Sequence, residues 1–322
     1  MAMEYRIYRY FWSRKNYKQK FVLGNTVVKL VSHGDKCEEI NFSVQGGTIY
    51  EVVIESDDSL DVVRQILDLL CCSYTLVYGY NEHDSDELVD NIVPETEKDD
   101  FWWGGIPQFC VSDTDCWYYA LLLAEKAYGN QRMINAITRY NSAHKIVNLH
   151  PMDLEPRNDP RIREYLLSEQ MNFANCIMAC YAALEEVELD VEGSRKCPIL
   201  NVDKTAWNPE IYAKVIGILK ESGIDPNAEL MWLSRMPNSP TQIKPLVKNI
   251  RDCEWSCGDI RDYYTTPVDA LLRIKQLRNK AGAHNDKEGI SLLSIYDVEN
   301  AFHLTRTLLL IKFGIYKLIE ED

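Results

Sequence analysis

Four residues that lie close together late in the chain form a candidate site for phosphate chemistry. They are Arg278, Asn279, Gly282 and His284, within residues 277–285. A guanidinium is a permanent cation whose planar fork matches a phosphate group, and an imidazole gains and loses a proton near neutral pH. The segment therefore predicts a site where the arginine stabilises negative charge developing on a scissile phosphate. The histidine would act as general acid or base in the same reaction.

Gly282 decides whether the arginine and the histidine can meet. On an unbroken helix, six residues rotate by about 600°, which would leave Arg278 and His284 far apart around the axis. A glycine that ends the helix can release His284 into a turn that bends back toward Arg278. A histidine just past a helix C-terminus also lies near negative dipole ends, which favour its protonated form.

Arg278 needs a counter-ion, and the sequence offers two kinds. It follows the apolar Ile274 by four residues on a helix expected to begin at the capping box of residues 266–269, which places it on or beside the packed stripe. A half-buried arginine without a partner is costly. A carboxylate on a neighbouring long helix, Glu185 or Glu188, would make it part of a structural salt bridge. A substrate phosphate in the same place would make it a binding residue.

The string from Arg278 to His284 resembles the R-x4-6-H motif of HEPN domains, and the segment from Cys180 to Glu185 resembles their early core helix. The resemblance covers roughly residues 160–322 and implies a helical bundle. It also implies a metal-independent endoribonuclease without a cofactor, commonly a homodimer whose two motifs face each other. On that basis Arg278, Asn279 and His284 are the expected catalytic residues and RNA is the expected partner. A defence or toxin effector, with the N-terminal unit sensing or regulating, is the expected role.

The chain departs from that family pattern in two places. Asp286 stands where some members have a tyrosine that a paired nucleotidyltransferase modifies, and residues 190–265 form a long insertion. Family members that only bind nucleotides or partners also exist. A non-catalytic dimerisation or nucleotide-binding module, in which the motif only braces the bundle, therefore remains an alternative. Asn279 and Gly282 favour the enzyme, because bracing alone does not require them.

The N-terminal half predicts a small α+β domain over residues 1–100. Alternating and β-branched residues indicate strands, with Gly46-Gly47 as a hairpin turn, at 5–10, 27–31 and 48–54. Ser59 precedes a helical pattern, and a further strand is expected from Tyr74 to Tyr80. The acidic stretch from Asn81 to Asp100 is interpreted as a solvated linker. An autoinhibitory mimic of nucleic acid is its alternative.

Residues 101–322 predict a mainly α-helical domain, HEPN-like from about residue 160. Five short polar residues directly precede a proline, which is typical of helix starts, at positions 159, 208, 225, 239 and 266. Long helices are expected from Ser112, from Arg132 to Ile146, from Pro160 to Val187, from Thr266, and from Ser294 to Ile319. Residues 190–265 are expected to hold inserted short helices. The predicted fold class is α+β, a small α+β unit followed by a helical bundle.

The bulk composition limits the possible partners. The 322 residues carry a formal net charge of -14, which opposes general adhesion to nucleic acid or anionic membranes. Any RNA contact must therefore be local. We expect no signal peptide and no membrane span, and the ten scattered cysteines indicate reduced thiols in a cytoplasmic protein.

Other candidate sites have weaker signals. Two cysteine pairs have the spacing of helical neighbours but lack the two-residue knuckle of zinc sites, so we interpret them as buried free thiols: Cys176 with Cys180, and Cys253 with Cys257. His303 is interpreted as a core histidine, and His144 and His150 as surface residues. Neither Gly46-Gly47 nor Gly104-Gly105 has a P-loop lysine, which argues against a kinase or ATPase.

Basic and aromatic residues interleave near the N-terminus. The cations are Arg6, Arg9, Arg14, Lys15, Lys18 and Lys20. This pattern suits a nucleic-acid surface, because aromatic rings stack on bases and cations contact phosphates. It equally suits an ordinary two-faced edge strand whose lysines discourage pairing, which is the interpretation we favour.

Overall fold

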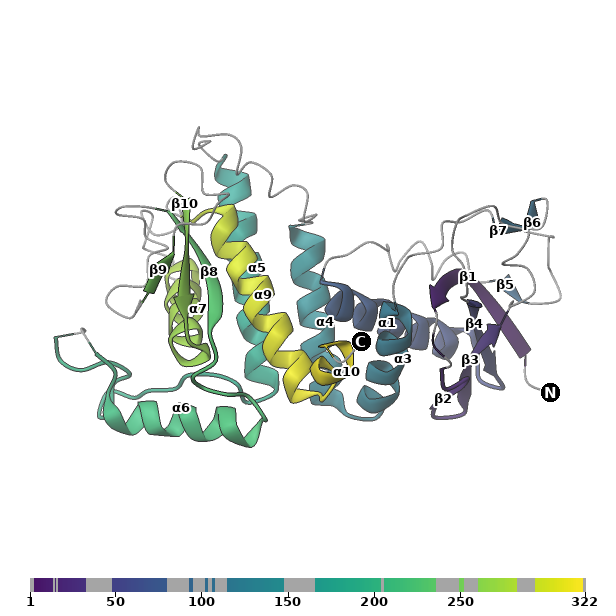
Figure 1. The fold of residues 1–322 in the computed structure, drawn as a ribbon, viewed down its shortest axis with the longest axis horizontal. Coiled ribbons are helices and arrows are strands. Elements are labelled where there is room, and N and C mark those ends of the chain that lie inside the picture. The colour runs from purple at the N-terminus through teal and green to yellow at the C-terminus, as the bar shows by residue number, and fades with distance from the viewer. Residues whose placement is uncertain are drawn as a thin grey trace. The chain divides into compact units, whose positions relative to one another are not determined.

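The computed structural model describes residues 3–13, 15, 17–32, 48–79, 93–94, 102–103, 106–107, 115–147, 166–203, 206–235, 249–251, 260–282 and 293–320. The chain divides into two compact units (Figure 1). The first comprises Met1–Tyr78 and Glu82–Ile134, and the second comprises Gly79–Asn81 and Asn135–Glu320. The first unit therefore extends beyond residue 100, where we expected the domain boundary.

The first unit contains a five-stranded antiparallel sheet, which confirms the strands predicted at 5–10, 27–31 and 48–54. The strands have the order β2-β3-β4-β1-β5 and are β1 (Met3–Ser13), β2 (Lys20–Leu23), β3 (Thr26–Ser32), β4 (Thr48–Ser56) and β5 (Val93–Pro94). The register of β1 against β4 shifts between Arg6 and Tyr10, so the strict alternation is interrupted there. The tight turn of the described hairpin is Gly24-Asn25, where Gly24 has a φ of 66°, a conformation that favours glycine. The predicted turn at Gly46-Gly47 lies outside the described residues.

Two helices pack against each other in this unit, α1 (Leu60–Tyr78) and α3 (Cys116–Ala127). The strand that we expected from Tyr74 is wrong, because α1 continues through Tyr78. Aromatic and β-branched residues imitate a strand there, but packing decides the outcome. Tyr74 is buried with its ring centroid 4.6 Å from that of Trp117. The short strands β6 (Trp102–Trp103) and β7 (Ile106–Pro107) pair with each other.

The second unit combines helices with a second antiparallel sheet. Helix α4 (Gln131–Ile146) begins in the first unit and continues into the second. The other helices are α5 (Leu167–Glu186), α6 (Pro209–Glu221), α7 (Pro267–Gly282), α9 (Ile295–Lys312) and α10 (Tyr316–Glu320). Helix α5 packs against both α7 and α9. Among the described helices, none is long and apolar enough to cross a membrane.

The sheet corrects the prediction that only short helices lie between residues 190 and 265. Its strands have the order β8-β10-β9 and are β8 (Leu230–Arg235), β9 (Asn249–Arg251) and β10 (Ile260–Thr265). Two of the places where a polar residue precedes a proline are described in this region. Asn208-Pro209 starts α6, as predicted, whereas Asp225-Pro226 forms a turn. There the Asp225 carboxylate accepts a hydrogen bond from the backbone N–H of Asn227 at 2.9 Å. This is the local bond that makes aspartate a turn residue.

A side chain of α9 closes the outer edge of β8. The buried Asn300 amide accepts a hydrogen bond from the Leu233 backbone N–H at 2.9 Å and donates one to the Leu233 carbonyl at 2.8 Å. It thereby supplies both bonds that a further strand would make to Leu233. This arrangement satisfies the edge at that residue and links the sheet to α9.

The predicted starts of the two last long helices are confirmed. Thr266 precedes Pro267 at the first position of α7 and accepts a bond from the Asp269 N–H. Ser294 and Asp297 form a capping box at α9, as their spacing predicted. The terminal helix does not run unbroken to Ile319. Helix α9 ends at Lys312. Two residues later Gly314 has a φ of 69°, and the short helix α10 follows.

Candidate functional site

Helix α7 places Arg278 at the edge of its packed side, as the periodicity predicted. Leu271, Ile274 and Leu277 are buried, whereas the Arg278 side chain is 40% exposed. The helix extends to Gly282, the last residue described before residue 293, so the predicted break after it stays a prediction. A cation in the last turns of a helix also lies near the negative end of the helix dipole.

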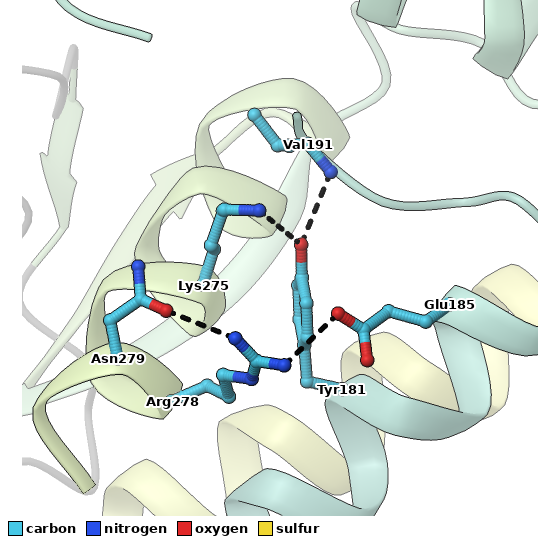
Figure 2. A network of polar contacts seen from close by, with 6 residues as sticks. All are labelled: Tyr181, Glu185, Val191, Lys275, Arg278 and Asn279. Atoms are coloured by element: carbon cyan, nitrogen blue, oxygen red, sulfur yellow. Dashed lines mark hydrogen bonds and ion pairs between the residues drawn. The ribbon is translucent and has the colours of Figure 1, made fainter. Parts of the chain in front are cut away.

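The Arg278 guanidinium has partners on three sides (Figure 2). Nη2 lies 3.3 Å from Oε1 of Glu185 on α5, and Nη1 donates a hydrogen bond to Oδ1 of Asn279 at 3.2 Å. Its Cζ lies 5.6 Å from the ring centroid of Tyr181, within range of a cation–π contact. The structural counter-ion considered from the sequence, Glu185, is therefore present in the described contacts.

Tyr181 joins a second cation of α7 to the same cluster. Its hydroxyl accepts a hydrogen bond from Nζ of Lys275 at 3.3 Å and another from the Val191 backbone N–H at 3.2 Å. Lys275 Nζ also lies 5.5 Å from the centre of the tyrosine ring. Burial raises the pKa of Tyr181, so the phenol stays neutral at physiological pH.

Opposing charges surround the two cations. Burial lowers the pKa of Lys275, an effect that Asp190 opposes and the neighbouring Arg278 reinforces. Burial raises the pKa of Asp190, and the like charge of Glu192 adds to this effect. The cluster is therefore a nearly balanced set of cations and carboxylates on a half-exposed surface.

The structure brings together two of the three predicted site residues. Asn279 is exposed and its amide oxygen contacts Arg278, whereas His284 lies outside the described residues. Sequence reasoning did not single out Lys275 or assign Tyr181 a role beyond the core. One available signal was that Lys275 lies three residues before Arg278, so both face the same side of α7.

Two histidine predictions are wrong. His144 is 1% exposed, because Tyr140 and His144 lie one helical turn apart on the side of α4 that packs on Phe302 of α9. The His144 ring stacks on Phe302 at a centroid distance of 3.7 Å, and burial lowers its pKa to about 3. His303, expected in the core, is exposed, because Phe302 takes the buried position and the next helical residue is turned away by about 100°. His150 lies outside the described residues.

The basic N-terminal stretch has internal partners where its side chains are described. Lys15 lies 3.6 Å from a carboxylate oxygen of Asp115, and Lys18 lies 2.6 Å from one of Glu125. Glu125 also accepts a hydrogen bond from the backbone N–H of Val22 in the edge strand β2. These pairs favour the structural interpretation. The acidic stretch from Asn81 to Asp100 lies outside the described residues, apart from the backbone of β5.

The thiols on α5 are buried. Cys176 and Cys180 are free, and burial raises the pKa of Cys176. Cys253 and Cys257 lie outside the described residues. Within the described part of the chain, histidine, cysteine and carboxylate side chains form no cluster of three or more that could hold a metal ion.

Comparison with known proteins adds no assignment to this geometry. No protein-family model, no curated protein and no solved structure matches the chain.

Proposed function

We propose that the second unit is a metal-independent endoribonuclease of the HEPN type, which acts as a homodimer on RNA in a defence or toxin role. One observation carries the proposal. Arg278 is half-exposed in the last turns of α7, bonded to the amide of Asn279, on a helix that extends to Gly282. His284 follows two residues later in the sequence, within the R-x4-6-H spacing.

In this proposal the ribose 2′-hydroxyl attacks phosphorus and the bond to the 5′-oxygen breaks. The products are a 2′,3′-cyclic phosphate and a 5′-hydroxyl. His284 takes the proton from the 2′-hydroxyl or delivers one to the leaving oxygen, and the second copy of the dimer supplies the complementary group. Arg278 neutralises the charge that develops on the phosphate oxygens, and Asn279 holds one edge of the guanidinium. These groups account for every proton transferred and for the developing charge, so the proposed reaction needs no metal ion.

Cleavage of a labelled single-stranded RNA in EDTA tests the proposal. We expect wild type to release fragments that end in a cyclic phosphate, and we expect His284→Ala and Arg278→Met to lose at least about 100-fold in rate. His303→Ala removes an exposed histidine of α9 and serves as the matched control. Full activity of His284→Ala, or no cleavage by wild type, would rule out the catalytic assignment.

The ion pair of Arg278 with Glu185 favours a second candidate, a non-catalytic dimerisation or nucleotide-binding module. This pair satisfies the arginine without any ligand and joins α7 to α5. In that case wild type would not cleave RNA, and Arg278→Met would weaken self-association or nucleotide binding. Sedimentation of wild type and Arg278→Met, with and without a nucleotide, distinguishes the two candidates.

A further inference from the structure

Two cations of α7 share one side of Tyr181. Lys275 and Arg278 are three residues apart, which places them on one face of the helix. Their charged groups lie 5.5 and 5.6 Å from the centre of the same ring (Figure 2). Like charges held near each other repel, which is one reason why the pKa of Lys275 is lowered. An anion between them would relieve this repulsion.

A carboxylate of the protein already acts on both cations. Glu185 is 3.3 Å from Arg278, and its charge also opposes the lowering of the Lys275 pKa. The side chains of Arg278 and Glu185 are 40% and 37% exposed, so a solute can reach the pair. Ion pairs this exposed to water contribute little free energy, and a better anion can exchange with the carboxylate.

We propose that Lys275 and Arg278 form a cradle for one phosphate group of single-stranded RNA, and that Glu185 competes with that phosphate for the cradle. The inference rests on the proposed function, because it specifies how the same site takes its substrate. A phosphate presents more acceptor oxygens than a carboxylate and suits the planar fork of Arg278. The buried Tyr181 forms the floor, and its hydroxyl holds Lys275 in reach.

The competition explains how an acidic chain limits its contact with RNA. Wild type must release the Glu185 carboxylate from Arg278 before a phosphate binds, so affinity is low until the contact is exchanged. A neutral amide at this position would leave Arg278 available and remove one repelling charge. Each phosphate contact on a single strand contributes about 0.7 to the slope of log affinity against log salt.

Binding of a fluorescent 2′-O-methyl RNA 12-mer, measured by anisotropy at several salt concentrations, tests the cradle separately from cleavage, because this RNA lacks the attacking hydroxyl. We expect Glu185→Gln to tighten binding about three- to tenfold. Lys275→Met and Arg278→Met should each weaken it about fivefold or more and reduce the salt slope by about 0.7. Lys275→Arg, which keeps the charge, should restore binding even if Lys275→Met folds poorly.

Glu186→Gln is the matched control. Glu186 is the next residue on α5 and pairs with Arg139 of α4 at 2.8 Å, so its substitution changes the net charge equally at a different ion pair. The affinity of Glu186→Gln for the RNA should stay within about twofold of that of wild type. Equal tightening by both variants, or unchanged binding by Glu185→Gln, overturns the cradle.

Cleavage separates this inference from the function on which it rests. If wild type cleaves unmodified RNA in EDTA while Glu185→Gln binds as wild type does, the nuclease stands and the cradle is wrong. If no variant cleaves RNA but Glu185→Gln tightens binding and Lys275→Met weakens it, the cradle stands and the nuclease is wrong.

Discussion

Arg273 and Arg278 lie five residues apart on α7 in opposite electrostatic settings. Arg273 is 6% exposed, and its Nε and Nη2 have no hydrogen-bond partner among the described residues. Burial lowers its pKa, and the buried carboxylate of Asp297 at the start of α9 opposes that effect. Arg278 instead contacts a half-exposed carboxylate and an exposed amide. A ligand can bind a cation such as Arg278 because the partner that it must displace is accessible to water.

The sharpest test of this contrast makes the same chemical change beside each arginine. Asp297→Asn should lower the free energy of unfolding by more than about 2 kcal/mol, because it removes the buried carboxylate whose charge opposes the cost of burying the Arg273 cation. An asparagine oxygen can still accept the bond that Asp297 receives from the Ser294 N–H, so the helix cap is largely retained. Glu185→Gln should lower the free energy of unfolding by less than about 1 kcal/mol. Urea unfolding followed by circular dichroism measures both.

A double variant checks the cause of that loss. Arg273→Met combined with Asp297→Asn removes both charges and should recover most of the stability, because an apolar side chain replaces an unpartnered buried cation. Equal small losses for Asp297→Asn and Glu185→Gln would show that Arg273 is not buried as described, and the contrast between the two arginines would disappear.

His144 extends the contrast to a buried group that can titrate. Its ring nitrogens have no hydrogen-bond partner among the described residues, and burial together with the nearby charge of Arg306 lowers its pKa from 6.5 to about 3. The unfolded chain therefore takes up a proton below about pH 6.5, whereas the folded chain does so only near pH 3. The stability contributed by neutral His144 is complete above pH 6.5 and is lost as the pH falls toward 3.

His144→Phe should remove this acid sensitivity while it keeps the stacking on Phe302. Between about pH 6.5 and pH 4, wild type should lose about 3 kcal/mol of unfolding free energy that the variant retains. Thermal unfolding across this range measures the difference, and Tyr140→Phe, which keeps the neighbouring ring and removes only its hydroxyl, should keep the wild-type slope. Identical slopes for wild type and His144→Phe would contradict the buried neutral histidine.

Asn300 shows the opposite case, a buried polar group with its bonds made. Asn300→Ala should cost about 2 kcal/mol, because it leaves the buried backbone N–H and carbonyl of Leu233 without partners. In the first unit, Glu125→Ala removes an exposed acceptor from the Val22 N–H. Water can replace that acceptor, so the cost should stay under about 1 kcal/mol. Urea unfolding compares the two, and equal costs would deny that burial makes the difference.

The parts of the fold that the sequence predicted have local signals. The starts of α7 and α9 follow from a capping residue and an acidic residue three positions later. The position of Arg278 at the edge of a packed stripe follows from helical periodicity alone. These features depend on neighbours within one or two turns, so they can be inferred without tertiary structure.

The missed features depend on partners far away in the chain. Lys275 bonds to Tyr181 across 94 residues, and no spacing rule indicates that pair. His144 was assigned to the surface because it lies close to a proline-rich loop in the sequence, but its ring stacks on Phe302. The sheet that contains β8 was not predicted, because a six-residue strand shows only a weak alternation of apolar and polar residues. At Leu233 the edge of β8 is bonded by the Asn300 side chain rather than by another strand.

The smallest expected effect is on the stability of Arg278→Met, and it decides what kind of residue Arg278 is. Its ion pair is exposed and screened by salt, so the variant should change the free energy of unfolding by less than about 1 kcal/mol, and roughly 0.5 M salt should reduce the difference further. Urea unfolding at low and high salt measures this. A loss of several kcal/mol that persists in salt would make Arg278 a structural brace like a buried charge, and would favour the non-catalytic module. A negligible loss of stability together with lost RNA cleavage would mean that Arg278 acts on the substrate, which displaces Glu185 from the guanidinium.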